Sequence, residues 1–229
     1  MGLMPEFAVS VRARSPGKTP ALRSAAQAER LFETARLVTV RPVSSLPSLV
    51  EGATGNRILK TWWGLAQGPL IYAMENRLTD RKDALRCKLA EGADTFVQRS
   101  LWSALDAIVR GRALPLAERG ALSPAAKSVW KRLAKGPVRY DHLREDLKFE
   151  TPAQGRVLQA AKQELLGLGI VVAREDKEAD THTHASLLCR WGDWYPAPGG
   201  GGPSPESAEA TLAGAARGAI ALLVKRSEG

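Results

Sequence analysis

Apolar residues between positions 121 and 196 recur at helical and strand spacing in a definite order. Ser123-Pro124 predicts a helix start, because serine caps the first turn and proline fits the first helical position. The apolar stripe of this helix recurs at i, i+4, i+7 and i+11: Leu122, Ala126, Val129 and Leu133. After the break at Gly136-Pro137, a shorter stripe predicts a second helix: Tyr140, Leu143 and Leu147.

A third helix is predicted from Thr151, where Thr151 and Gln154 have the spacing of a capping box. Its predicted buried stripe is Val157, Ala161, Leu165 and Leu168. Gly167 and Gly169 end it, and the β-branched run 170–172 predicts a strand. A polar segment, Arg174 to His184, separates that strand from a return strand, Ser186 to Arg190.

The order helix, helix, capped helix, strand, polar loop, strand predicts a winged helix-turn-helix over residues 121–196, because three such helices close a core over a small hairpin. A generic small α+β domain is the alternative interpretation. Residues 23–120 predict a mixed α/β unit, with a helix near 24–36 and short strands at 37–40 and 95–97. The pattern assigns no topology there, and a diverged winged-helix-like unit is one interpretation. The whole chain is thus expected to be a mainly helical α+β protein.

The remaining segments have biased compositions. Residues 1–22 predict a flexible basic arm that contains Arg12, Arg14 and Lys18. Residues 197–205 predict a Gly/Pro linker. Residues 206–229 predict an Ala-rich tail helix, which either docks on the chain or mediates self-association through one apolar side: Leu212, Ala216, Ala219 and Leu223.

The net charge of +9 and a pI near 9.9 favour a polyanionic partner, and double-stranded DNA is the partner we expect. No apolar run approaches the ~20 residues of a membrane-spanning helix, so no membrane partner is predicted. Two distant cysteines form no disulfide framework, so we expect a reducing, cytoplasmic setting.

Candidate chemistry is sparse. His182 and His184 lie in the polar loop as H-T-H, and with Asp180 or Cys189 they could share a metal. Loop histidines without a third fixed ligand are more often solvated, so the sequence predicts neither a metal nor a cofactor. We find no phosphate loop and no nucleophile elbow in the sequence.

The third helix offers a surface for reading DNA. Arg156, Gln159 and Gln163 fall opposite its predicted stripe, and Lys162 lies on a flank. Arg and Gln match the edges of guanine and adenine in a major groove. We therefore expect this nucleic-acid-binding set, arm included: Arg156, Gln159, Lys162, Gln163, Arg12, Arg14 and Lys18. An ordinary solvated helix face is the alternative.

The polar loop argues against DNA binding, since its acidic side chains would repel the phosphates of DNA. These side chains are Glu175, Asp176, Glu178 and Asp180. Binding of this unit to another protein is the alternative. Two tryptophan pairs, Trp62-Trp63 and Trp191/Trp194, are expected in the core. The alternative for Trp194-Tyr195 is a stacking platform.

Three sequence features resemble proteins related to the AlkZ-type winged-helix DNA glycosylases, over roughly residues 25–196. These are the run LVTVRPVSSLPSL from Leu37, the pattern W-W-x(8)-Y from Trp62, and LSPAAKSVW…LGIVV from Leu122. The resemblance implies tandem winged-helix units with a basic DNA surface, and a Gln–apolar–Gln or Gln–apolar–Asp catalytic motif. Only Gln27-Ala28-Glu29 has a carboxylate at that spacing, in a predicted surface helix, so no catalytic residue is carried over.

The leading hypothesis is a cytoplasmic, non-catalytic DNA-binding protein, linked to DNA repair through the resemblance. A glycosylase with a non-standard catalytic group is the second hypothesis. A protein-interaction adaptor or transcriptional regulator, acting through the acidic loop and the tail helix, is the third.

Overall fold

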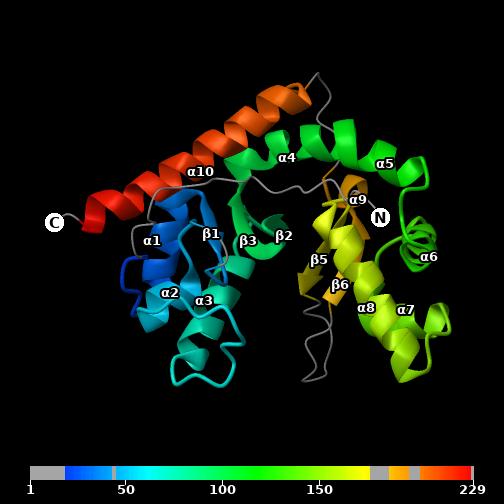
Figure 1. The fold of residues 1–229 in the computed structure, drawn as a ribbon, viewed down its shortest axis with the longest axis horizontal. Helices are drawn as coiled ribbons and strands as arrows, with labels where there is room; N and C mark the ends of the chain where they lie inside the picture. Colours follow the sequence, from blue (N-terminus) through cyan, green and yellow to red (C-terminus); the bar gives the residue numbers. More distant parts are fainter. Residues whose placement is uncertain (1–18, 43–44, 176–185, 196–201, 228–229) are drawn as a thin grey trace. The chain divides into compact units, whose positions relative to one another are not determined.

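The computed structural model describes residues 19–42, 45–175, 186–195 and 202–227 (Figure 1). The described part is α+β, as expected: it is about 55% helical and holds two small antiparallel sheets of three strands each. The chain divides into two compact units, one ending at Leu105 and resuming at Glu206, the other running from Asp106 to Pro205.

The first unit begins with a helix whose ends follow from local chemistry. The Ser24 side chain accepts a hydrogen bond from the Gln27 N–H, and Arg36 ends the helix in the left-handed region with φ 62°. The elements of this unit are α1 (Ala25–Ala35), β1 (Leu37–Thr39), α2 (Leu49–Thr54), α3 (Gly68–Thr79), β2 (Ala84–Ala90), β3 (Ala93–Gln98), the 3-10 helix η1 (Arg99–Leu101), α4 (Trp102–Ile108), which continues into the second unit, and α10 (Pro205–Ser227).

The second unit contains the predicted three-helix pattern and one additional short strand. Its elements are a π-helical turn η2 (Val109–Ala113), α5 (Leu114–Glu118), α6 (Pro124–Leu133), β4 (Val138–Arg139), α7 (Tyr140–Asp146), α8 (Pro152–Gly167), β5 (Val171–Glu175), β6 (Ser186–Arg190) and α9 (Trp191–Trp194). The sequence pattern did not indicate β4, because it has only two residues.

Both sheets have the same internal order. In the first, β3 lies between β1 and β2, and Val97 pairs with Leu37 on one side and Leu85 on the other. In the second, β6 lies between β4 and β5, and Leu188 pairs with Val138 and Ala173. In each unit the chain therefore runs helix, strand, helix, helix, strand, strand, and the last strand lies between the other two.

The packing of the helices is also the same in the two units. In the first unit α1 packs against α3, and in the second α6 packs against α8. Each pair contributes fully buried side chains to the core of its unit, such as Phe32 and Met74 in the first and Leu133 and Leu158 in the second. The two units are thus built on one plan.

The predicted buried stripe of α8 is wrong at its first position. Val157 is 49% exposed, whereas its neighbour Leu158 is buried. Ala161, Leu165 and Leu168 are buried as expected. Leu158, Ala161 and Leu165 have the i, i+3, i+7 spacing of a single helix face, so the buried stripe begins one residue later.

The expectation that the tryptophans lie in the core holds for Trp62 and Trp191, both buried. It is wrong for Trp63, whose exposed fraction is 64%. Trp194 is half-buried and packs beside Trp191 and Tyr195.

The end of the predicted flexible arm, residues 19–22, is packed against the first unit. Thr19 and Leu22 are buried, and the Leu22 N–H donates to the Gly52 carbonyl at 2.8 Å. The predicted contact residues Arg12, Arg14 and Lys18 lie outside the described residues. So do His182 and His184, together with most of the acidic loop.

The tail forms the expected helix, α10, which groups with the first unit. Its apolar side is buried within the chain: Ala208, Leu212, Ala215, Ala216 and Ala219. Among the described helices, none combines the length and the apolar character needed to cross a bilayer.

Candidate nucleic-acid interfaces

Helix α8 begins at the predicted capping box. The Gln154 N–H donates to Thr151 Oγ1 at 3.3 Å, and the Thr151 N–H donates to Gln154 Oε1 at 2.9 Å. Gly169, with φ 68°, takes the left-handed conformation just after the helix. Both ends of α8 are therefore fixed by local sequence.

The four predicted contact residues of α8 lie on its solvent side. Arg156, Gln159 and Gln163 are exposed, and the half-buried Lys162 holds its ammonium 4.3 Å from the centre of the Tyr140 ring. The structure brings these residues together on one helix, as the spacing predicted. Three of them point to solvent, and Lys162 is partly engaged by the aromatic ring.

The outer face of α8 carries no carboxylate along most of its length. The first acidic residue of the helix is Glu164, which is half-buried and accepts the Ser123 N–H at 2.9 Å. Glu164 thus ties α8 to the start of α6 instead of facing solvent as a repelling charge. The exposed residues before it are uncharged except for Arg156, so the face is polar and weakly cationic.

Several other arginines of this unit hold the fold together. Arg144 donates to the carbonyls of Phe149 and Glu150, which shapes the turn between α7 and α8. Further structural pairs are Arg110 with Asp106, Arg132 with Asp146, Arg139 with Asp141, and Arg190 with the Trp130 ring and carbonyl. Arg156 differs, because it forms no hydrogen bond or ion pair with any described residue.

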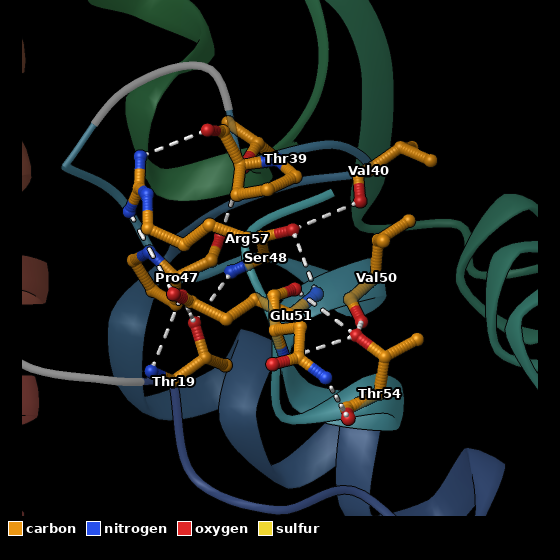
Figure 2. Close-up of polar contacts among 11 residues, drawn as sticks. Thr19, Thr39, Val40, Pro47, Ser48, Val50, Glu51, Thr54 and Arg57 are labelled. Atoms are coloured by element: carbon orange, nitrogen blue, oxygen red, sulfur yellow. Dashed lines mark hydrogen bonds and ion pairs between the residues drawn. The ribbon is translucent and has the colours of Figure 1, made fainter. Parts of the chain in front are cut away.

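The first unit contains a buried polar cluster around Glu51, which is 3% exposed (Figure 2). Its Oε2 accepts the Thr19 hydroxyl at 2.5 Å and the Thr19 N–H at 3.3 Å. Its Oε1 lies 3.7 Å from Arg57 Nη1, and Arg57 also donates to the Pro42 carbonyl at 2.8 Å. The Ser48 N–H donates in turn to Thr19 Oγ1 at 3.1 Å.

This Glu51 cluster links two segments of the chain that are distant in the sequence. Glu51 is placed by α2, whose N-cap is Ser48, and Thr19 comes from the segment before α1. Because each carboxylate oxygen is engaged by a donor or a cation, the cluster is suited to structure rather than proton transfer. It also fixes Arg57 at the beginning of the loop between α2 and α3.

That loop, residues 55–67, presents the most exposed aromatic side chain among the described residues. Trp63 stacks on the buried Trp62 with ring centres 4.0 Å apart and an interplanar angle of 23°. Tyr72 of α3 lies beside it, 5.9 Å away. Arg41 donates from Nη1 to the Leu59 carbonyl at 3.2 Å, which holds the loop against the chain after β1.

The described residues contain no group of three or more metal-ligating side chains. Burial raises the pKa of the Cys87 thiol to about 12 and that of Cys189 to about 11, so both thiols are protonated near neutral pH. The buried Asp106 accepts from Trp191 Nε1 and Arg110 Nε, both at 2.6 Å. These groups are engaged or inert, and none forms a nucleophile–base pair.

Sequence reasoning missed the Glu51 cluster and the exposure of Trp63. The spacing Ser48-x-x-Glu51 is a helix-start signal that indicates α2, but it does not identify Thr19 as the partner of Glu51. The pair Trp62-Trp63 carries no signal in the sequence for which ring is buried, because both residues are of the same type. Comparison of the chain with protein families, curated proteins and solved structures finds no match.

Proposed function

We propose that this protein binds double-stranded DNA through the exposed face of α8, without catalysis of its own. The observation that carries the proposal is the face itself, where Arg156, Gln159 and Gln163 are exposed and no carboxylate lies among them. Arg and Gln supply the paired donors and acceptors that match guanine and adenine edges.

The order of elements supports the proposal. Helix, strand, helix, helix, strand, strand, with the last strand in the centre, is the order of a winged helix-turn-helix. In helix-turn-helix proteins the recognition helix lies in the major groove. By this correspondence α8 is the recognition helix of the second unit, and α3 occupies the same place in the first.

Electrostatics support the same ligand. The net charge is +9, and the charges that stabilise the fold are paired internally, as with Arg132 and Asp146. Arg156 remains available on the surface, where a phosphate or a base edge would engage it. The proposed relationship to the AlkZ-type glycosylases implies the same ligand.

Replacing Arg156 with alanine tests the proposal directly. Arg156→Ala should weaken duplex binding by about 1–3 kcal/mol if the side chain reads a base edge, and more on some sequences than others. A phosphate contact would instead weaken all sequences alike and reduce the salt slope by about one. Fluorescence anisotropy with labelled duplexes at two salt concentrations distinguishes the two.

The matched control is Arg217→Ala, since Arg217 is also an exposed arginine, on α10. It removes the same charge from a different helix and should change duplex affinity little. If both variants bind duplex like the parent protein, α8 does not contact DNA. The same preparations are assayed for base release from alkylated duplex, where we expect none above background, and measurable release would support the glycosylase hypothesis instead.

A further inference from the structure

Trp63 has a geometry that neither core packing nor duplex recognition by α8 explains. Its exposed fraction is 64%, and the buried Trp62 supports one face of its indole at 4.0 Å. An exposed indole costs free energy in water, because its apolar area stays hydrated. A ring held on a rigid backing and open to solvent is arranged to stack on another flat ring.

The charges of the loop that carries Trp63 favour an anionic partner. Between Glu51 and Glu75 the sequence contains no acidic residue, while Arg57 and Lys60 lie within that stretch. Lys60 is exposed and forms no ion pair with any described residue. Arg41, bound to the Leu59 carbonyl, adds a second cation beside the same loop, whereas the charge of Arg57 is offset by its ion pair with Glu51.

The loop is held in place before any ligand arrives. Arg57 is fixed by Glu51 and the Pro42 carbonyl, and the Leu65 N–H donates to the Trp62 carbonyl at 3.1 Å. The corresponding connection in the second unit, residues 147–151, is much shorter and contains no tryptophan. The loop at 55–67 is therefore an addition to the shared plan, and the addition carries the aromatic ring.

We propose that Trp63 stacks on an unpaired base of DNA while Lys60 binds a neighbouring phosphate. This inference rests on the proposed function only in taking DNA as the ligand, and it assigns a separate surface on the first unit to single-stranded or unstacked DNA. Stacking on an aromatic side chain tolerates any base, so the site selects unpaired bases rather than a sequence.

The test compares binding of an oligothymidylate of about 12 nucleotides, a length typical of such sites, by the full chain and its variants. Trp63→Ala should weaken this binding by about five- to 160-fold. Trp63→Phe keeps a stacking ring and should lose only about threefold. Lys60→Ala should reduce the slope of log K against log salt by about 0.7.

Leu59→Ala is the matched control, since Leu59 is a similarly exposed apolar residue of the same loop, at 59%. Its oligothymidylate affinity should match that of the parent protein, because an aliphatic side chain does not stack. A loss from Leu59→Ala as large as that from Trp63→Ala would overturn the proposal in favour of a general apolar docking patch. Unchanged oligothymidylate binding by a folded Trp63→Ala variant would overturn it as well.

The duplex experiment separates this inference from the proposed function. Trp63→Ala should bind intact duplex like the parent protein, whereas Arg156→Ala should not. If Arg156→Ala leaves duplex binding intact while Trp63→Ala abolishes oligothymidylate binding, the single-strand site stands and the role of α8 is rejected. The reverse result rejects the single-strand site alone.

Discussion

At the scale of single residues, two buried carboxylates, those of Glu51 and Asp106, show how this protein accommodates charge in its interior. Glu51 and Asp106 are each engaged by two partners, one of them an arginine. A buried charge without such partners costs several kcal/mol, and losing one partner costs more than the net value of the bond. The main effect of these contacts is therefore to determine which segments of the chain pack together, and their net contribution to stability is smaller.

Thr19→Val tests this account at the Glu51 cluster. The substitution preserves the shape of the side chain but removes the hydroxyl that donates to Glu51 and accepts from the Ser48 N–H. We expect the free energy of unfolding to fall by about 1.5–3 kcal/mol, the range for a hydrogen bond to a charged group. Urea denaturation followed by far-UV circular dichroism measures the change.

Thr34→Val is the control for Thr19→Val. Thr34 is exposed on α1 and its hydroxyl donates to the Arg30 carbonyl of the same helix, so its loss should change stability by less than about 0.5 kcal/mol. Equal effects of the two substitutions would show that the Glu51 cluster does not depend on Thr19.

At the scale of secondary-structure elements, α8 shows both the power and the limit of sequence periodicity. Its start, its end and its exposed residues follow from caps, glycines and spacing. Its first buried residue does not, because Val157 and Leu158 are both apolar and each forms a helical series with Ala161 and Leu165. The series i, i+4, i+8 and i, i+3, i+7 are nearly equivalent on a helix, so only the packed partner decides between them.

Alanine substitutions at the two positions distinguish the series. Leu158→Ala should lower the free energy of unfolding by about 2–5 kcal/mol, because it leaves a cavity in the core of the second unit. Val157→Ala should change it by less than about 0.5 kcal/mol, since Val157 faces solvent and alanine favours the helix. The denaturant midpoints of both variants, compared with the parent protein, give the answer, and the opposite ranking would restore the stripe that begins at Val157.

At the scale of the whole molecule, the two units share one order of helices and strands, and the sequence predicted that order only for the second unit. There the caps and glycines delimit each helix clearly. In the first unit, β2 (Ala84–Ala90) contains Arg86, Cys87 and Lys88, and its half-buried pattern lacks the clear alternation of a strand. The likeness of the first unit to the second is visible only in the pairing of its strands, because strand order depends on contacts between residues that are distant in the sequence. For the same reason the exposure of Trp63 could not be derived from its own segment.

The tail helix permits a whole-molecule test of the remaining alternative, self-association. Its apolar side is already buried within the chain, so α10 is expected to stabilise the first unit instead of joining two copies. Leu212→Ala should therefore lower the free energy of unfolding by about 2–5 kcal/mol, independently of protein concentration. Thr211→Ala, at an exposed neighbouring position, should leave stability almost unchanged.

Sedimentation velocity on the same two variants completes this argument. If α10 is an internal element, neither substitution changes the oligomeric state, and the loss of stability in Leu212→Ala is the same at low and high protein concentration. If α10 instead joins two copies, Leu212→Ala would shift the protein toward monomer, and the unfolding midpoint of the parent protein would rise with concentration, because association stabilises the folded state by mass action. The concentration dependence of the midpoint therefore decides whether the tail completes one molecule or connects two.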